Sequence, residues 1–547
     1  MIMQEILSRL NANLLKQLID DYYCGSVLKI TDSNKLSEWQ NDCKTLVSMV
    51  LATYGNDLFY NKTVRRLFLE TLPLNKLVEI AQHLNKPKYQ KKYDLASTIA
   101  NSPWRYGSSL ARIFAREFQI PSDYLPNKSN SMDSTEIVDP FEDIPDLLEY
   151  QEQIKVKLER ILSNEGSRAL LHMPTGSGKT RTVLDAAIEY FLQNNIFEKQ
   201  QSILWFAHTE ELCNQAIDAF KDIWQKSADR PARIVRYWGG YKPMLEELGG
   251  SFIVGSLQKF YNIVSKGGEI FETINECAYL VVIDEAHKAL APTYNRVLSK
   301  LTKDNKKVLI GLSATPGRGT ESDIENRELS ILFGKTLIAP YFEGRNPIDA
   351  LRDMGVLSKV KRIVRSSKIA INLNEDEMEY AMSFADLPTT VLSRLARDNN
   401  RNKLIISILR EQLANNNSCL VFACSVEHSR LLSAAVNFLG FKAAHIDCTM
   451  RRGSRRYKIE NFKRGKLDVL INYGILSTGF DAPKTKTIII TRPTNSIVLY
   501  SQMVGRGLRG PLMGGTEHCD LIDIKDNYEN FGDVDKVYEY FSDYWEK

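Results

Sequence analysis

A short run of residues combines the side chains that a phosphate-binding loop requires. It follows an apolar segment at 169–171 and precedes residues 181–190, whose apolar positions recur at helical spacing. Its two glycines allow backbone N–H groups to approach phosphate oxygens, and the start of a helix adds partial positive charge. The lysine is expected to reach the β- and γ-phosphates of a nucleotide, and the final hydroxyl to bind Mg²⁺. The candidate nucleotide-binding residues of this loop are Thr175, Gly176, Ser177, Gly178, Lys179 and Thr180.

One position of this loop departs from the usual pattern, in which a glycine comes five residues before the second glycine. That place is taken by Met173. A glycine-rich turn between a strand and a helix would have a similar composition. The assignment therefore depends on the residues elsewhere in the chain that complete the chemistry.

A pair of carboxylates follows another apolar run, at 279–283. Asp284 and Glu285 come directly after it and are followed by Ala286 and His287. Ligands of parallel α/β folds bind at the carboxyl ends of the strands, so both carboxylates are expected there. Asp284 is the candidate Mg²⁺ ligand, acting through the water shell of the ion. Glu285 is the candidate group that orients or deprotonates an attacking water.

Two series of apolar runs alternate with amphipathic segments, which indicates two parallel α/β sheets. The strands expected in the first series are 169–171, 202–207, 233–237, 252–254, 279–283 and 308–312. The strands expected in the second series are 419–423, 443–446, 467–472 and 487–491. The second series contains no phosphate-binding loop, so it is expected to close over the nucleotide.

Residues 1–125 are expected to form an all-helical accessory domain, because their apolar residues recur at helical spacing. Within it, helices at 74–84 and 94–101 flank a basic loop. Lysines alternate there with aromatic rings, at Lys86, Lys88, Tyr89, Lys91, Lys92 and Tyr93. The order is similar to that of the small SAP-type DNA-binding module. Contact of this loop with DNA and a simple solvated hairpin are the two interpretations.

Residues 126–149 differ in composition from the segments on either side. Seven acidic residues from Asp133 to Glu149 follow a single lysine, Lys128, and Pro140 and Pro145 lie among them. So few apolar residues cannot build a core, which predicts an acidic linker and a domain boundary near residue 150. The expected domains beyond it are a first α/β lobe at 150–340 that binds ATP, an inter-lobe connection at 341–400, and a second lobe at 401–547.

The overall composition is that of a globular protein, with 43% hydrophobic and 25% charged residues. The net charge of +4, from 71 basic and 67 acidic residues, is too small to indicate a nucleic-acid partner by itself. No apolar run reaches the roughly 18 residues that a membrane span requires, and the first residues lack a signal-peptide pattern. A cytoplasmic location without membrane contact is expected.

The cysteines are spaced in a way that argues against a zinc ribbon and against a disulfide framework, because none forms a C-x-x-C pair. All of them are expected to be buried thiols. They are Cys24, Cys43, Cys213, Cys277, Cys419, Cys424, Cys448 and Cys519.

The order of the motifs resembles that of the superfamily 2 helicases of the DEAH-box type, over about residues 150–525. The similar blocks are Tyr150-Gln151, Phe206 to Leu212, Gly255 to Gln258, Asp284 to His287, Ser313 to Thr315, Gly474 to Pro483, and Gln502 to Arg509. The resemblance implies two tandem RecA-like domains with parallel sheets, ATP and Mg²⁺ as ligands, and hydrolysis of ATP coupled to movement on nucleic acid.

The resemblance also implies roles for single residues. Gln151 contacts adenine, and Asp481 lies at the nucleotide. The residues implied in nucleic-acid contact or in coupling hydrolysis to domain movement are His208, Ser256, His287, Ser313, Thr315 and Thr478.

The arginines of the last block have a clear physical purpose. Negative charge develops on the γ-phosphate during its transfer. An arginine from the opposite lobe stabilises that charge only when the lobes close, and such a residue contributes about 10³- to 10⁵-fold in rate. Arg509 is the first candidate for this residue, with Arg506 beside it on the phosphates. Gly505 and Gly507 permit a close approach of the backbone.

A further basic cluster lies on an expected helix. It comprises Arg451, Arg452, Arg455, Arg456 and Lys458. The cluster is either a contact for a phosphate backbone or a solvated helix face.

The sequences of the last two blocks are similar to those of the DNA-directed branch of this superfamily. That branch includes restriction-enzyme motor subunits and RadD-type repair ATPases. RNA-directed DEAH proteins usually carry a longer arginine-rich block, which Met503 and Leu508 interrupt here. RadD-type proteins carry a cysteine-rich metal site near the C-terminus, where this chain has only Cys519.

Three functions are consistent with the motifs. The first is an ATP-dependent DNA helicase or translocase that acts in repair or anti-phage defence. The second is an ATP-switched DNA-binding motor subunit of a complex in which a nuclease or other effector is a separate chain. The third is an RNA helicase.

Overall fold

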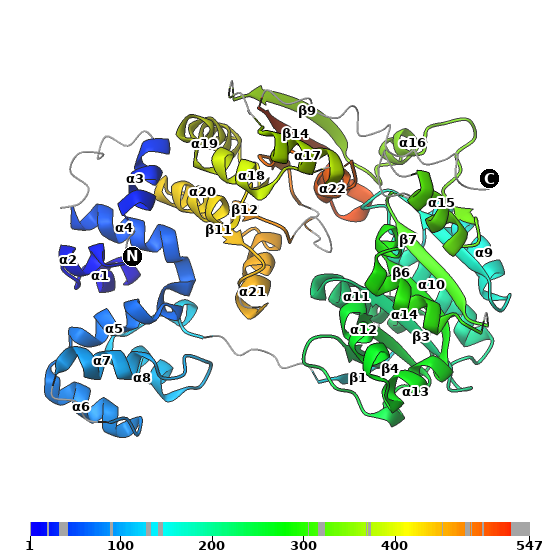
Figure 1. Cartoon of the computed structure of the whole chain (residues 1–547), viewed down its shortest axis with the longest axis horizontal. Coiled ribbons are helices and arrows are strands. Elements are labelled where there is room, and N and C mark those ends of the chain that lie inside the picture. Colours follow the sequence, from blue (N-terminus) through cyan, green and yellow to red (C-terminus); the bar gives the residue numbers. More distant parts are fainter. Residues whose placement is uncertain are drawn as a thin grey trace.

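The computed structural model describes most of the chain. The described residues are 2–18, 21–31, 42–87, 91–126, 133–140, 146–304, 306–315, 323–367, 369, 373–384, 386–450, 452–475, 482, 484–494 and 497–526. Figure 1 shows a helical region at the N-terminus and two α/β lobes. None of the described helices combines the length and apolarity that a bilayer crossing requires.

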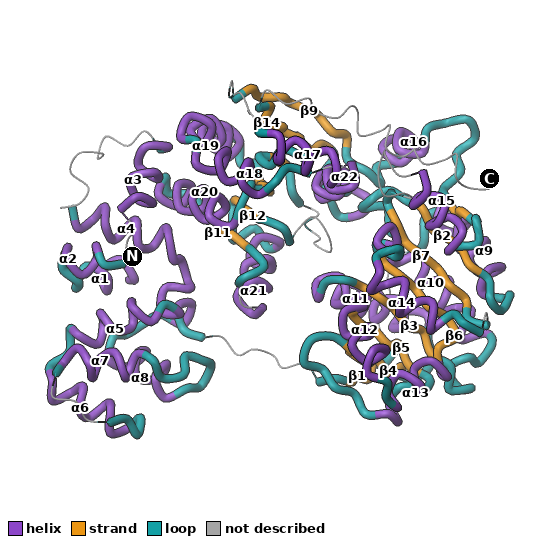
Figure 2. Tube along the Cα trace, viewed as in Figure 1, coloured by secondary structure: helices purple, strands orange, loops and turns teal. Residues whose placement is uncertain are grey.

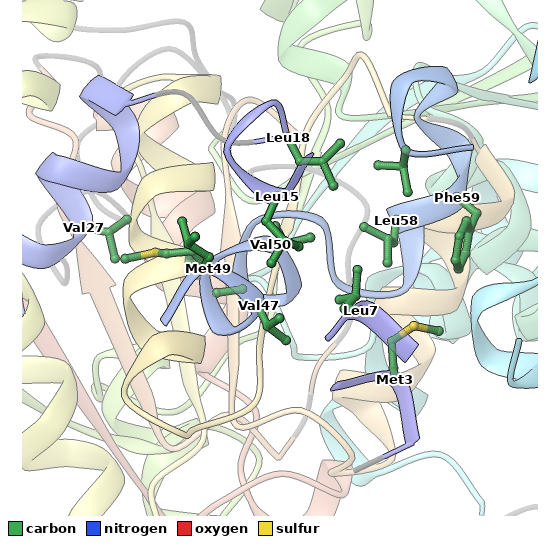
Figure 3. Close-up of a cluster of buried hydrophobic side chains, with 14 of the residues drawn as sticks. Met3, Leu7, Leu15, Leu18, Val27, Val47, Met49, Val50, Leu58 and Phe59 are labelled. Atoms are coloured by element: carbon green, nitrogen blue, oxygen red, sulfur yellow. The ribbon is translucent and has the colours of Figure 1, made fainter. Parts of the chain in front are cut away.

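The accessory region is helical throughout its described part, as the sequence predicts (Figure 2). Its elements are α1 (Ile2–Leu7), α2 (Ala12–Lys16), α3 (Asp21–Ile30), α4 (Cys43–Tyr54), η1 (Gly55–Tyr60), α5 (Lys62–Glu70), α6 (Leu74–His83), α7 (Lys92–Ala100), α8 (Ser109–Glu117) and η2 (Ser122–Tyr124). The apolar side chains of the first helices point toward one another, and Leu15, Val50 and Leu58 among them are fully buried (Figure 3).

The accessory region shares its hydrophobic core with the second lobe. Helix α4 packs on α20 (Val426–Phe438), and α3 packs on both α20 and α19 (Asn399–Ala414). One continuous cluster of buried side chains extends from the first helices to Ile405 and Leu432 of these two helices. In Figure 1, α3 and α4 lie beside α19 and α20. The accessory region is therefore anchored to one lobe.

The first lobe contains an eight-stranded sheet in the order β1-β4-β5-β3-β6-β7-β2-β8. Its strands are β1 (Thr135–Val138), β2 (Arg168–His172), β3 (Ser202–Ala207), β4 (Ala232–Tyr237), β5 (Ser251–Ser256), β6 (Ala278–Asp284), β7 (Val308–Ser313) and β8 (Leu337–Ile338). All neighbouring pairs are parallel except β1 with β4. Every residue of β3 and β7 is buried, which explains the continuous apolar runs of the sequence.

Helices cover this sheet and connect its strands. They are α9 (Glu149–Leu162), α10 (Lys179–Gln193), α11 (Glu210–Ser227), η3 (Leu245–Glu247), α12 (Leu257–Lys266), α13 (Glu269–Cys277), η4 (Ala286–Lys288), α14 (Pro292–Leu301), α15 (Asp323–Leu332) and α16 (Pro347–Asp353).

The second lobe contains a six-stranded sheet in the order β11-β12-β10-β13-β14-β9, with every described pair parallel. Its strands are β9 (Lys359–Ser366), β10 (Cys419–Phe422), β11 (Ala443–Ile446), β12 (Val469–Asn472), β13 (Thr487–Ile490) and β14 (His518–Lys525). The remaining elements are α17 (Glu375–Phe384), α18 (Thr389–Arg397), α19, α20, α21 (Arg452–Lys463), α22 (Ile497–Val504), η5 (Gly505–Gly507) and η6 (Pro511–Met513).

Two segments differ from the sequence-based expectation. The segment 126–149, expected to be a linker, contributes β1 as an antiparallel edge strand of the first sheet. The segment 341–400, expected to be a connection, contains β9, which pairs with β14 over eight residues. Both are edge strands with exposed residues, so neither has the apolar run that identifies a central strand.

The expectation of eight buried thiols is wrong for two cysteines. Cys43 and Cys448 are exposed, whereas Cys213, Cys277, Cys419, Cys424 and Cys519 are buried and free. Burial raises the pKa of Cys419 and of Cys519 to about 12. The side chain of Cys24 lies outside the described residues.

Candidate ATP site between the two lobes

The predicted phosphate-binding loop lies between β2 and the start of α10. Gly176 and Gly178 both have a φ of 88°, in the left-handed region that favours glycine. A Cβ on Gly178 would lie 2.4 Å from Nε2 of Gln151, so a larger residue would displace the amide of Gln151. Lys179 is the first residue of α10, and its Nζ donates to the carbonyl oxygens of Met173 and Pro174 at 3.0 and 3.2 Å. The loop therefore has the strand–loop–helix form that phosphate binding requires.

Helix α9 holds this loop from the side. Tyr150 Oη donates to the carbonyl of Ser177 at 2.7 Å, and Gln151 Nε2 donates to the same carbonyl at 3.1 Å. The other end of the Gln151 amide accepts from the backbone N–H of Leu148. Gln151 is 1% exposed. In this structure it fixes the loop, and its contact with adenine stays a prediction.

The two carboxylates occupy the end of β6, as the sequence predicts. Asp284 is the last residue of the strand, and its Oδ1 accepts from the backbone N–H of Glu285 at 2.9 Å. Glu285 has φ 55° and ψ 51°. A non-glycine residue with this left-handed backbone is strained, and such residues concentrate at functional sites.

The environment separates the pKa values of the two carboxylates. Burial, together with repulsion from Glu285, raises the pKa of Asp284 to about 7. Burial also acts on Glu285, but the positive charges of His287, Lys179 and Arg506 outweigh it and hold the pKa of Glu285 below its ordinary value. Glu285 is thus ionised and able to accept a proton from water, which matches its predicted role.

Burial also changes the pKa of the loop lysine. It lowers the pKa of Lys179 to about 8, although Glu285 and Asp284 oppose the change. Lys179 therefore lies within electrostatic reach of both carboxylates. The predicted phosphate, metal and water residues belong to one site.

The residues present fit a Mg²⁺ ion. A buried carboxylate with a raised pKa gains most from a nearby cation, and Asp284 is such a group. Thr180 follows Lys179 in the first turn of α10. No group of three or more acidic, histidine or cysteine side chains suited to a metal occurs among the described residues. Mg²⁺ is usually held by one or two protein groups and the phosphates of the substrate, and Thr180 and Asp284 could supply the protein groups.

The second lobe contributes its predicted arginines to the same site. A Cβ on Gly176 would lie 3.2 Å from Cγ of Arg509, and a Cβ on Gly505 would lie 2.6 Å from Cβ of Thr175. The backbone around the arginines is therefore in contact with the phosphate-binding loop. The charge of Arg506 acts on Lys179, Asp284 and Glu285 alike. Figure 1 shows α22, which leads into this segment, beside the first lobe.

A chain of polar contacts joins the carboxylates to the predicted coupling residues. His287 Nδ1 lies 3.4 Å from Oε2 of Glu285 and 3.4 Å from Oγ of Ser313. Ser313 Oγ donates to the carbonyl of Thr315 at 2.5 Å. His287, Ser313 and Thr315 thus lie together next to Glu285, and their roles in coupling stay predictions.

Gln502 is a site residue that the sequence-based assignment left out. Its Nε2 donates to Oε2 of Glu285 at 3.4 Å and lies 3.5 Å from Nε2 of His287. Gln502 belongs to the second lobe, so it connects the arginine-bearing segment to the water-orienting carboxylate. The sequence feature that could have identified Gln502 as a site residue is its position at the start of the block 502–509.

The predicted nucleic-acid residues of the first lobe lie on neighbouring strands. Ser256 ends β5, opposite Ala207 of β3, and His208 directly follows that residue. Lys288 Nζ donates to Nε2 of His208 at 2.8 Å. Burial and the charge of Lys288 lower the pKa of His208 to about 3, so its ring is neutral. Thr478 and Asp481 lie outside the described residues.

Two members of the basic cluster on α21 form ion pairs with other parts of the protein. Arg455 pairs with Glu211 of α11 in the first lobe at 2.7 Å. Lys458 pairs with Asp57 of the accessory region at 2.8 Å, and Ser454 Oγ donates to the same carboxylate at 2.8 Å. Helix α21 therefore contacts all three parts of the protein. Arg456 is exposed, and Arg451 and the side chain of Arg452 lie outside the described residues, so the choice between a phosphate contact and a solvated face is untested for these three arginines.

The basic loop of the accessory region is partly described. Lys91, Lys92 and Tyr93 are exposed, and the Arg66 guanidinium lies 4.7 Å from the centre of the Tyr93 ring. Lys88 and Tyr89 lie outside the described residues. The choice between DNA contact and a solvated hairpin stays open.

Both lobes are similar to known protein families. Residues 144–318 match the family described as "Type III restriction enzyme, res subunit", and residues 400–510 match "Helicase conserved C-terminal domain". Together the two matches cover just over half of the chain. The chain therefore carries the two domains of the superfamily 2 helicases, and these families imply hydrolysis of ATP. Within that class it is related to the res subunits of restriction enzymes.

Individual relatives are distant. A putative ATP-dependent helicase IRC3 from Saccharomyces cerevisiae is 26% identical over 387 residues, which cover 70% of this chain and 51% of that protein. A putative helicase 22 from a Sulfolobus islandicus filamentous virus is 27% identical over 62% of this chain and 57% of that protein. The chain thus spans little more than half the length of these relatives.

Solved structures are also similar. The Pyrococcus furiosus Hef helicase domain aligns with 72% of this chain and 97% of its own, with a TM-score of 0.41 and 18% identity.

Proposed function

We propose that this protein is a nucleic-acid motor that acts on DNA, as an ATP-dependent DNA helicase or translocase. The observation that carries the nucleotide chemistry is the contact of Arg509 and Gly505 from one lobe with Gly176 and Thr175 of the other. The preference for DNA is supported by the sequence of the arginine-bearing segment, in which Met503 and Leu508 interrupt the pattern usual in RNA-directed DEAH proteins.

The chemical roles follow from the geometry. Backbone N–H groups of the loop and Lys179 hold the phosphates, and Glu285 orients the attacking water and accepts its proton. Thr180 and Asp284 would hold Mg²⁺, which neutralises charge on the phosphates when bound. Arg506 and Arg509 stabilise the charge that develops on the γ-phosphate. Because they belong to the other lobe, hydrolysis requires lobe closure.

The dependence of hydrolysis on lobe closure also provides a way to move along DNA. His287 and Gln502 contact Glu285 from the coupling residues and from the second lobe. A change at the γ-phosphate therefore alters the contact between the lobes. Alternate closure and opening of the lobes over a bound DNA strand would move the protein along that DNA. His208 and Ser256 are the residues that would contact the DNA.

The test is a comparison of DNA with RNA. ATP hydrolysis is measured with single-stranded, duplex and forked DNA and with RNA of matched length and sequence, each at two salt concentrations because phosphate contacts are screened. We expect DNA to stimulate hydrolysis more than RNA at both salt concentrations. A stronger response to RNA would assign the motor to RNA instead.

A second function is favoured by the match of the first lobe to a restriction-enzyme subunit family. In that case the chain is an ATP-switched DNA-binding motor subunit, and a separate chain carries the effector, in restriction-like defence. Strand separation by the purified chain alone distinguishes the two functions. Efficient unwinding without a partner supports the autonomous helicase, and DNA-stimulated hydrolysis without unwinding supports the subunit.

A further inference from the structure

The polypeptide that joins the two lobes is hydrogen-bonded to the segment that carries Arg509. The Ser358 backbone N–H donates to the carbonyl of Leu508 at 2.8 Å, and the Gly510 N–H donates to the carbonyl of Val356 at 2.9 Å. Leu357 and Arg509 form an antiparallel β-bridge between these two bonds. The inter-lobe connection and the arginine-bearing segment therefore form one short ladder.

A buried hydroxyl closes this ladder. Ser358 is fully buried, and its Oγ lies 2.6 Å from the carbonyl oxygen of Arg509 and 2.5 Å from that of Thr516. The hydroxyl has one proton and can donate to either carbonyl. The Thr516 N–H also donates to the Arg509 carbonyl, at 3.0 Å. Ser358 thus ties together both ends of the turn that begins at Arg509.

The ladder has no spare room. A Cβ on Gly510 would lie 2.2 Å from the carbonyl oxygen of Gly355, and a Cβ on Gly515 would lie 2.0 Å from that of Arg509. Neither position has room for a side chain, and the hydrogen bonds of the ladder hold the two backbones in register. The position of the Arg509 backbone is therefore set by the inter-lobe connection.

We propose that Ser358 is a positioning residue for ATP hydrolysis, which holds the Arg509 backbone where its guanidinium reaches the γ-phosphate across the lobe interface. This inference rests on the role of Arg509 proposed above. Ser358 itself does not touch the nucleotide. The segment that carries Arg509 and the inter-lobe connection form one unit. Movement of the connection when the lobes close or open is therefore transmitted directly to the guanidinium of Arg509.

The test is the variant Ser358→Ala, with Ser429→Ala as its matched control. Ser429 is also fully buried and donates to a backbone carbonyl, that of Val426 at 2.7 Å, but it lies in α20. A misplacement of about 1 Å can cost about 100-fold in rate, so we expect Ser358→Ala to lower kcat by about 10- to 100-fold. The KM for ATP and the affinity for a fluorescent ATP analogue should change less than twofold, because the loop of the first lobe is untouched. Ser429→Ala should leave kcat unchanged.

A second pair of variants tests the inference even if Ser358→Ala fails to fold. Gly510→Ala pushes a methyl group against the connection, whereas Gly240→Ala places one in open space. We expect Gly510→Ala to lower kcat with little change in KM, and Gly240→Ala to lower neither. Equal kcat values for Ser358→Ala and Ser429→Ala, or for Gly510→Ala and Gly240→Ala, would overturn the inference.

A double-mutant cycle separates positioning from general stability. In an Arg509→Ala background, measured by single-turnover hydrolysis, Ser358→Ala should have no further effect on the rate. A further loss by the same factor would show that Ser358 acts independently of Arg509 and would contradict the inference. If Arg509→Ala keeps the full rate, the proposed role of Arg509 fails. If Arg509→Ala loses the rate while Ser358→Ala keeps it, only the positioning role fails.

Discussion

At the scale of single residues, the ATP site divides its work between groups in different electrostatic environments. Burial raises the pKa of Asp284 to about 7, while the positive charges around Glu285 outweigh burial and hold the pKa of Glu285 low. Two adjacent carboxylates thus differ in the ease with which they ionise. The different tasks that we propose for them are consistent with their different surroundings.

The division of roles predicts different kinetics for two substitutions. Lys179→Ala removes a charge that binds the phosphates, so nucleotide affinity and hydrolysis should both be lost. Glu285→Gln keeps the shape but not the base, so we expect kcat to fall by about 10²- to 10⁴-fold while nucleotide binding is retained. Steady-state hydrolysis and equilibrium binding of a fluorescent analogue measure both. Undiminished hydrolysis in either variant would contradict the site.

Buried histidines predict how stability depends on pH. His428 is fully enclosed between Asn402 and the backbone of Cys424, and burial lowers its pKa to about 3. The unfolded chain binds a proton at this residue below about pH 6.5, and the folded chain does not until about pH 3. Folding stability should therefore fall as the pH falls from 6.5, by up to about 1.4 kcal/mol per pH unit for this group.

The measurement is the thermal midpoint of unfolding from pH 8 to pH 4.5. Wild type should lose stability below pH 6.5, and His428→Gln should show a shallower loss. An identical pH profile for the two proteins would show that His428 is not held neutral.

At the scale of elements, α21 connects the first lobe to the rest of the protein. The Arg455–Glu211 pair is the contact of this helix with α11, and both side chains are largely buried. A pair of this kind contributes about 1 kcal/mol, which corresponds to about a fivefold change in an equilibrium constant. The ratio of closed to open lobes should change by that factor when the pair is removed.

Arg455→Ala tests this contact, with Arg464→Ala as its control. Arg464 also pairs with a glutamate at 2.8 Å, but its partner Glu460 lies on the same helix. Fluorescence energy transfer between labels on the two lobes, with a non-hydrolysable ATP analogue, reports closure. We expect a shift toward the open form in Arg455→Ala only, and an equal effect of both substitutions would contradict a role in closure.

The sequence predicted the central strands better than the edges of the sheets. Strands β3, β6, β7 and β10 have buried, uninterrupted apolar runs and were expected close to their observed bounds. Strand β9 carries basic residues and is mostly exposed, so its pairing with β14 has no signature in local composition. Edge strands are recognised by what they pair with, which a local pattern does not contain.

The same limit applies to the site. Lys179, Asp284, Glu285, Arg506 and Arg509 were predicted because each belongs to a motif with its own local chemistry. Gln502 belongs to the block 502–509, but that block gives it no role of its own. Ser358 belongs to none of the sequence motifs. Both act through contacts between segments far apart in the chain, at 3.4 Å to Glu285 and 2.6 Å to Arg509.

At the scale of the whole molecule, the accessory region and the second lobe share one core. Buried side chains continue without interruption from α3 and α4 to α19 and α20. Asp57 adds polar contacts with Ser454 and Lys458. The accessory region should therefore move with the second lobe when the lobes close.

Removal of residues 1–125 should consequently destabilise the second lobe, because it exposes the apolar faces of α19 and α20 to water. Limited proteolysis followed during heating measures the stability of each lobe separately. The second lobe should become susceptible at a lower temperature than in the full chain, while the first lobe should keep its affinity for nucleotide. Unchanged protection of the second lobe would contradict the shared core.

The central claim is that the ATP site is complete only when the second lobe places its arginines against the loop of the first. The most direct measurement is single-turnover ATP hydrolysis by wild type and Arg509→Ala, with and without single-stranded DNA. We predict equal nucleotide binding by the two proteins, stimulation of wild type by the DNA, and a rate for Arg509→Ala that is lower by about 10³-fold or more. DNA-stimulated hydrolysis at the wild-type rate by Arg509→Ala would contradict the account.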